Sequence, residues 1–153
     1  MKTSRVTDDV RSCVDRARDA LTTVMQDRSF AAGEALFRQG EAPCAMYFLR
    51  SGLVHLERPG ADLGPGLCVA RPGDVIGVTY AVSGRPYDMN AVATKPCSLE
   101  VVPRDEFLRM MIEVPGLHLE VVRMLSIDLG RCYEVLRTLG PKARSRHSEA
   151  GTL

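Results

Sequence analysis

The chain has few of the side chains from which metal centres are built. Its five cysteines stand at positions 13, 44, 68, 97 and 132, so that no two lie closer than 24 residues in sequence. This spacing argues against the paired-cysteine signatures of zinc and iron–sulfur sites. The three histidines, His55, His118 and His147, include no H-x-H pair. A metal-dependent enzyme, which needs several histidines and a carboxylate together, is therefore the least favoured function.

Long apolar runs and an excess of one charge are also missing. No stretch approaches the ~20 apolar residues of a membrane-spanning helix, and the N-terminal MKTSRVTDDV lacks the apolar core of a secretion signal. A cytoplasmic protein with free thiols is expected. The 20 Lys and Arg residues balance 19 Asp and Glu residues, a net charge of +1. A strongly basic, nucleic-acid-binding surface is therefore not expected.

The order of the apolar patterns predicts one mainly β domain with flanking helices. Apolar residues recur at three- and four-residue steps over residues 7–27, which predicts an amphipathic helix with Thr7 as a possible cap. Between residues 29 and 102 the pattern changes to seven or so short apolar runs separated by glycine-containing turns. Such spacing predicts an antiparallel jelly-roll β-barrel. Pro103 then begins a short helix.

The clearest element lies between residues 115 and 140, where two apolar stripes predict a long helix. One stripe has the three-and-four alternation of a heptad seam and comprises Val122, Leu125, Leu129, Cys132, Leu136 and Leu139. The other comprises Leu117, Val121, Met124 and Val135 and would face the barrel. A helix that is apolar on two sides predicts a parallel homodimer, with a helix packed only within its own chain as the alternative.

An ordered set of short motifs extends over residues 28–140. It comprises Gly33-Glu34, Gln39-Gly40-Glu41, Tyr47-Phe48, Ser51-Gly52-Leu53-Val54, Arg71-Pro72-Gly73-Asp74, Ile76-Gly77, Cys97-Ser98-Leu99-Glu100, and Arg104 with Phe107. In this order the chain resembles the effector module of the catabolite activator protein and fumarate–nitrate regulator family, the bacterial branch of cyclic nucleotide-binding domains. The resemblance implies an effector domain at residues 1–114 and a dimerisation helix at 115–140. Residues 141–153 are expected to form a disordered tail.

The resemblance places the ligand loop at residues 73–93, where this chain departs from the nucleotide-binding members. In those members a glutamate after the glycine binds the ribose, and an arginine about ten residues later pairs with the cyclic phosphate. Here Val78 follows Gly77, and Tyr87 stands at the arginine position, followed by Asp88. A phosphate would lose its charge-assisted partner and would have a like charge nearby. Ordinary cyclic AMP binding is therefore predicted to be lost.

Several residues remain candidates for ligand contacts. They are Gly77, Val78, Thr79, Arg85, Tyr87, Asp88 and Cys132. Arg85 would replace the missing arginine if it bent inward; the alternative is an exposed arginine in the turn Gly84-Arg85-Pro86. Cys132 matches the hydroxyl residue that meets the purine in nucleotide binders. In a symmetric dimer Cys132 would face its copy, which permits a disulfide or thiol sensing, or it is simply a small seam residue.

The resulting prediction is a non-catalytic regulatory module with no cofactor. Only 13 residues follow Gly140, too few for the winged helix-turn-helix of full-length family members, so direct DNA binding is not expected. The signal would pass to a protein partner, or the chain would form mixed dimers with full-length relatives. The alternatives are a true cyclic AMP or cyclic GMP binder that uses Arg85, and a haem or thiol redox sensor of the same architecture.

Overall fold

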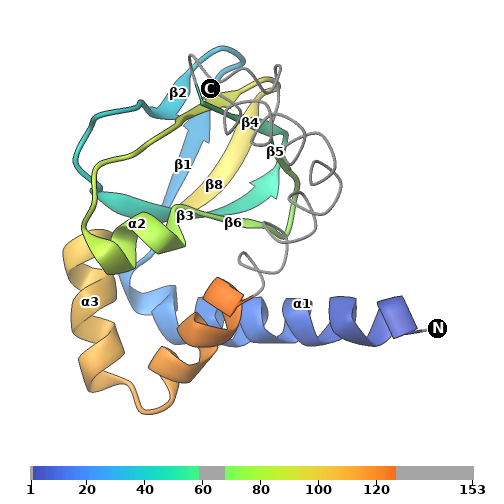
Figure 1. The fold of residues 1–153 in the computed structure, drawn as a ribbon, viewed down its shortest axis with the longest axis vertical. Helices are drawn as coiled ribbons and strands as arrows, with labels where there is room; N and C mark the ends of the chain where they lie inside the picture. Colours follow the sequence, from blue (N-terminus) through green and yellow to red (C-terminus); the bar gives the residue numbers. More distant parts are fainter. Residues whose placement is uncertain (1, 59–67, 127–153) are drawn as a thin grey trace, which may run out of the picture.

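The computed structural model describes residues 2–58 and 68–126 (Figure 1). Its helices are α1 (Lys2–Leu21), α2 (Val78–Ser83) and α3 (Arg104–Glu113), with a 3-10 turn at Thr22–Val24. Its strands are β1 (Gln26–Phe30), β2 (Ala35–Phe37), β3 (Ala45–Ser51), β4 (Val54–Glu57), β5 (Cys68–Ala70), β6 (Val75–Ile76), β7 (Asn90–Ala93) and β8 (Cys97–Pro103). Two antiparallel four-stranded sheets, in the orders β1-β8-β3-β6 and β2-β7-β4-β5, confirm the predicted jelly roll.

Strand β3 contributes to two hydrophobic cores because its side chains alternate between the faces of the sheet. Tyr47 and Leu49 belong to the cluster inside the barrel, whereas Met46 and Phe48 belong to a second cluster. This second cluster also takes buried residues from α1, α2 and α3. Figure 1 shows these helices gathered on one side of the barrel. Helices therefore cover the part of this sheet's outer face around Met46, Phe48 and Val102, whereas Asp27 and Ser29 of β1 are exposed.

The N-terminal helix differs from its prediction at both ends. It begins at Lys2, so Thr7 lies inside it, and it ends at Leu21. The next three residues, Thr22, Thr23 and Val24, are all β-branched and form the 3-10 turn. β-Branched side chains lose rotamer freedom in an α-helix, so the α-helix ends before them. Residues predicted as the last helical turn instead pair with β8 as the start of β1. The predicted buried face is confirmed by Cys13, Ala17 and Leu21.

The segment expected to be a strand and an open loop contains a helix. Strand β6 has only two residues, and α2 follows directly after Gly77. Gly77 and Gly84 bound α2 with φ values of 87° and 74°, a left-handed conformation that favours glycine. Val78 and Ala81 bury one side of this short helix in the second cluster. Packing thus stabilises a helix that its own β-branched sequence does not favour.

Residues 117–126 are helical and confirm that the chain re-enters a helix after Pro115. Leu117, Val121 and Met124 are buried in the second cluster, as predicted for the stripe facing the barrel. In the other stripe Val122 is 55% exposed, whereas Leu125 is partly buried against the same cluster. The remaining predicted seam residues lie outside the described residues, together with Val135 and the tail: Leu129, Cys132, Leu136 and Leu139.

No helix of the described residues is long and apolar enough to cross a membrane.

Candidate ligand site in the barrel

Tyr87 lies at the predicted phosphate position and fills the interior of the barrel. Its side chain is 2% exposed and stacks on Phe37 of β2, with ring centroids 3.7 Å apart and planes 7° apart. The Tyr87 hydroxyl donates a hydrogen bond to the Ala45 carbonyl oxygen at 3.4 Å. Burial raises the pKa of this phenol, so Tyr87 stays neutral near pH 7. An uncharged ring therefore occupies the place where an arginine would offer a positive charge.

The backbone holds Tyr87 in this position through the turn after β2. The Gly40 amide donates to the Tyr87 carbonyl oxygen at 2.8 Å, and the Tyr87 amide donates to the Glu41 carbonyl oxygen at 3.0 Å. The Gln39 amide donates to the side-chain oxygen of Asn90 at 2.7 Å, which ties the same turn to β7. These bonds link segments about fifty residues apart in sequence. The inward direction of Tyr87 is thus a property of the tertiary fold.

Four aromatic rings form an aromatic cluster in the barrel: Phe37, Tyr47, Tyr80 and Tyr87. Tyr80 of α2 meets Tyr87 edge-on at 4.9 Å and 64°, and Tyr47 of β3 lies 6.3 Å from Phe37. Edge-on and offset arrangements of this kind are attractive beyond the burial of area. The cluster therefore joins α2 to both sheets through contacts between rings.

Asp88 closes the outer side of the aromatic cluster with a charged network. Its carboxylate accepts a hydrogen bond from the Tyr80 hydroxyl and an ion pair from Arg58 Nη2 at 2.8 Å. Burial and then the bond to Asp88 raise the pKa of Tyr80, so its hydroxyl remains a donor. Sequence analysis treated Asp88 as a charge that would repel phosphate. In the structure Arg58 offsets that charge.

The other candidate residues do not join this cluster. Val78, at the position of the ribose-binding glutamate, is 2% exposed and packs in the helix-side cluster with Phe107 and Met110. Thr79 and Arg85 are exposed. The Arg85 guanidinium makes no hydrogen bond or ion pair with the described residues, although its backbone amide bonds Ser83 Oγ at 3.3 Å. Cys132 lies outside the described part of the chain.

This site also includes residues that the sequence patterns did not predict for it: Phe37, Tyr80, Arg58 and Arg104. Arg104 Nε donates to the Ala81 carbonyl oxygen at 2.9 Å, so α3 holds the C-terminal end of α2. The sequence held one signal of an aromatic cluster: three of its four tyrosines, at positions 47, 80 and 87, fall within the predicted barrel. Only the ring contacts in the folded chain show that these tyrosines share one interior with Phe37.

Metal ligands are not grouped in the described residues. No set of three or more His, Cys, Asp and Glu side chains lies close enough to hold a metal ion within residues 2–58 and 68–126.

A comparison with protein families identifies the fold. A model of the cyclic nucleotide-binding domain matches residues 27–113, which is more than half of the chain. The chain belongs to this family. The matched range contains both sheets except for Gln26, together with α2 and α3, and so includes every residue of the aromatic cluster.

Solved structures show the same architecture for the cyclic nucleotide-binding domain. The catabolite activator protein of Thermus thermophilus is 24% identical with a TM-score of 0.68, over 82% of this chain and 59% of that one. A cyclic nucleotide-binding domain of Methylobacillus flagellatus is 22% identical with a TM-score of 0.72, over 83% of this chain and 72% of that one. These likenesses confirm the fold of the regulator effector modules.

Curated relatives carry the same domain within a much longer protein. Human patatin-like phospholipase domain-containing protein 6 is 24% identical over 97 residues, which are 62% of this chain and 7% of that protein. The chain thus spans only a small part of the curated relatives it matches. By their names, the relatives of this domain include regulators and an enzyme.

Proposed function

We propose that this chain is a non-catalytic regulatory module whose phosphate subsite is occupied by Tyr87 instead of by a cyclic nucleotide. The observation that supports this is the stack of Tyr87 on Phe37 at 3.7 Å, at the position of the phosphate-binding arginine. A cyclic phosphate entering the site would have to displace a buried ring and would find no guanidinium there. The module works in the cytoplasm and passes its state to a partner protein.

The test is the melting temperature of the full chain with and without about 1 mM cyclic AMP or cyclic GMP, checked by calorimetry. A ligand at a hundred times its dissociation constant stabilises a protein by about 2.7 kcal/mol, which gives a clear rise. We expect no rise with either nucleotide and no heat of binding. A saturable heat with either nucleotide would contradict the proposal.

The second candidate function is nucleotide binding through Arg85. The observation that favours it is the exposed Arg85 guanidinium, which no described residue engages and which lies two residues before Tyr87. For Arg85 to bind the phosphate, the turn after α2 would have to fold inward. Binding that is present in the wild-type chain and lost in Arg85→Ala, but kept in the exposed control Arg71→Ala, would establish this function and exclude the first.

We further propose that the chain acts as a homodimer through residues 115–140. Supporting this, Val122 exposes its side chain on a helix whose opposite side is already buried by Leu117, Val121 and Met124. The seam would continue through Leu129, Cys132, Leu136 and Leu139. The same surface would allow mixed dimers with full-length relatives, and co-expression followed by a search for heterodimers would test that.

A further inference from the structure

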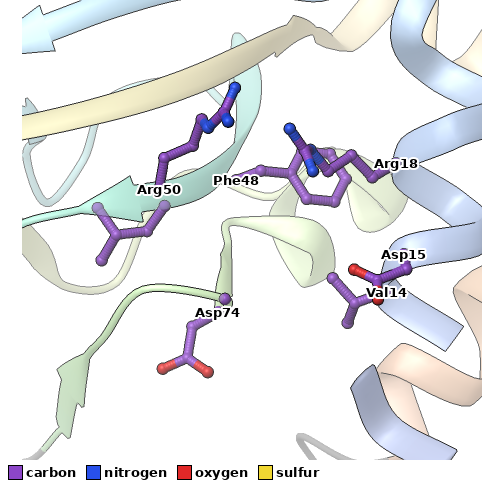
Figure 2. A pocket seen from close by; sticks show the side chains of 8 residues that line it. Val14, Asp15, Arg18, Phe48, Arg50 and Asp74 are labelled. Carbon is purple, nitrogen blue, oxygen red and sulfur yellow. The ribbon is translucent and has the colours of Figure 1, made fainter. Parts of the chain in front are cut away.

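A pocket of about 210 Å³ opens on the helix side of the sheet, between α1 and β3 (Figure 2). Its lining comes from three elements: Val14, Asp15 and Arg18 of α1, Phe48, Leu49 and Arg50 of β3, and Gly73 and Asp74 of the turn before β6. Phe48 and Tyr47 point to opposite faces of β3, so this pocket lies across the sheet from the aromatic cluster. It is therefore a second site, separate from the position where the family binds nucleotides.

A buried carboxylate fixes the positive side of this pocket. Glu100 of β8 is 4% exposed and accepts hydrogen bonds from Arg18 Nε at 2.7 Å and from Arg50 Nη1 at 2.8 Å. Arg18 Nη2 bonds the same carboxylate. A guanidinium has five N–H groups, so each arginine keeps donors that Glu100 does not use. Glu100 thus holds two guanidinium groups in place at the pocket without using all of their donors.

Two carboxylates form the negative side. Asp74 is anchored because it accepts a hydrogen bond from the Arg71 amide at 2.9 Å. Asp15 is exposed on α1 and makes no hydrogen bond or ion pair with another described residue. In Figure 2 the guanidinium groups of Arg18 and Arg50 lie in the upper part of the view and both carboxylates lie below them. Charges of opposite sign therefore lie on different sides of one opening.

We propose that this pocket binds a small zwitterion of the amino-acid type. Its carboxylate faces Arg18 and Arg50, its ammonium group faces Asp15 and Asp74, and its apolar part lies against Val14 and Phe48. Arg18 and Arg50 share the single charge of Glu100 and keep one side of the pocket positive, whereas Asp15 and Asp74 make the other side negative. An ion of one sign is therefore attracted on one side and repelled on the other. A zwitterion satisfies both sides. The volume lies below the ~300–1,000 Å³ of drug-sized sites, which favours a ligand as small as an amino acid.

Such a ligand would join α1 to the barrel. Arg18 and Asp15 belong to the helix, whereas Arg50 and Asp74 belong to β3 and the turn before β6, so one bound molecule contacts both parts. This pocket thus provides the module with a place for an effector outside the barrel interior. The inference does not depend on whether the barrel also binds a nucleotide.

The test is calorimetry of the full chain with L-leucine and L-alanine up to about 10 mM. We expect saturable binding of at least one of them. Isoamylamine lacks the carboxylate of leucine, and N-acetyl-L-leucine lacks its ammonium group. Each analogue is expected to bind at least about tenfold more weakly, because a hydrogen bond to a charged group contributes about 1.5–3 kcal/mol.

Two variants and a control place the binding in this pocket. Asp15→Asn and Arg50→Gln are each expected to weaken binding by about tenfold, while Asp19→Asn, on the same helix outside the lining, leaves it unchanged. Arg50→Gln also loses its bond to Glu100, so circular dichroism and the melting temperature check its fold. Asp15→Asn removes no hydrogen bond or ion pair with a described residue. The charges of Asp15 and Asp19 both act on Arg18, so Asp19→Asn controls for that electrostatic effect. Failure of both amino acids to bind, equal binding of the analogues, or binding that Asp15→Asn leaves unchanged would overturn the proposal.

Discussion

At the scale of single residues, Tyr87 gives the interior of the barrel a buried, uncharged aromatic ring. The barrel around it has the fold of cyclic nucleotide-binding domains. An arginine at this position would need an anion beside it, because a buried unpaired guanidinium is very unfavourable. A tyrosine needs only a neighbouring ring and one acceptor, which Phe37 and the Ala45 carbonyl supply. The ring and the hydroxyl of Tyr87 thus both have partners inside the barrel.

Substitutions of Tyr87 will measure how much its buried ring contributes to the free energy of unfolding. Tyr87→Ala is expected to lower the free energy of unfolding by about 3–5 kcal/mol, as for other large buried aromatic residues. Tyr87→Phe keeps the stack and loses only the 3.4 Å hydrogen bond, so a loss below about 1.5 kcal/mol is expected. Urea unfolding followed by circular dichroism makes the comparison. A mild effect of Tyr87→Ala would mean that the ring is not part of the core.

Glu100 gives a second prediction at this scale, with a defined pH dependence. The hydrogen bond from Arg18, and then the charges of Arg18 and Arg50, hold the pKa of Glu100 below its usual range. Its contribution to stability is therefore complete above the ordinary glutamate pKa of about 4.3 and is lost as the pH falls through the lower folded-state value. Glu100→Gln is expected to cost about 1–3 kcal/mol at pH 7, since both arginines are partly exposed.

Unfolding of the wild-type chain and Glu100→Gln should be compared from pH 7 into the acid range. The difference between them is expected to shrink below about pH 4. A difference that stayed constant through this range would show that Glu100 acts through packing rather than through charge.

At the scale of elements, the turn from β3 to β4 depends on Gly52 for two reasons. Its φ of +99° disfavours side chains, and a Cβ there would lie 2.5 Å from the Pro96 carbonyl oxygen. Gly33 has a similar φ of +92°, but a Cβ there would meet nothing within 4 Å. Gly33→Ala is therefore a control that measures only the free-energy cost of the positive φ. We expect Gly33→Ala to cost about 1–2 kcal/mol and Gly52→Ala at least about 2 kcal/mol more. Equal losses of unfolding free energy would show that the turn relaxes.

The strands were predictable from sequence because alternation of apolar residues and turn glycines is a local property. Helix α2 was not, since four of its six residues are of types that favour strands. Its stability comes from burying Val78 and Ala81 beside α3. Strand β1 was missed for the same reason. Its sequence QDRSF has one buried residue, and its state is decided by pairing with β8, about seventy residues away.

At the scale of the whole molecule, the proposed dimer makes Val122 the residue to test. Two copies of Val122 would be buried in a symmetric parallel interface, so Val122→Ser is expected to weaken association by about tenfold to a hundredfold. Ile112 is the matched control, because it is 88% exposed on α3 and outside the predicted seam. Sedimentation equilibrium of the full chain measures both variants. A monomeric wild-type chain, or an equal effect of Ile112→Ser, would contradict the proposed seam.

The sequence by itself determined the class of fold and the buried face of the N-terminal helix, and it predicts the loss of the usual ribose and phosphate contacts. Each of these depends on residue type and local spacing, which are visible without coordinates. Only the tertiary structure decided that Tyr87 turns inward onto Phe37, that Asp88 is paired with Arg58, and that two arginines share Glu100 beside a separate pocket. The physical reason is that the direction and partners of a side chain depend on which distant strands and helices pack together. No local pattern carries that information.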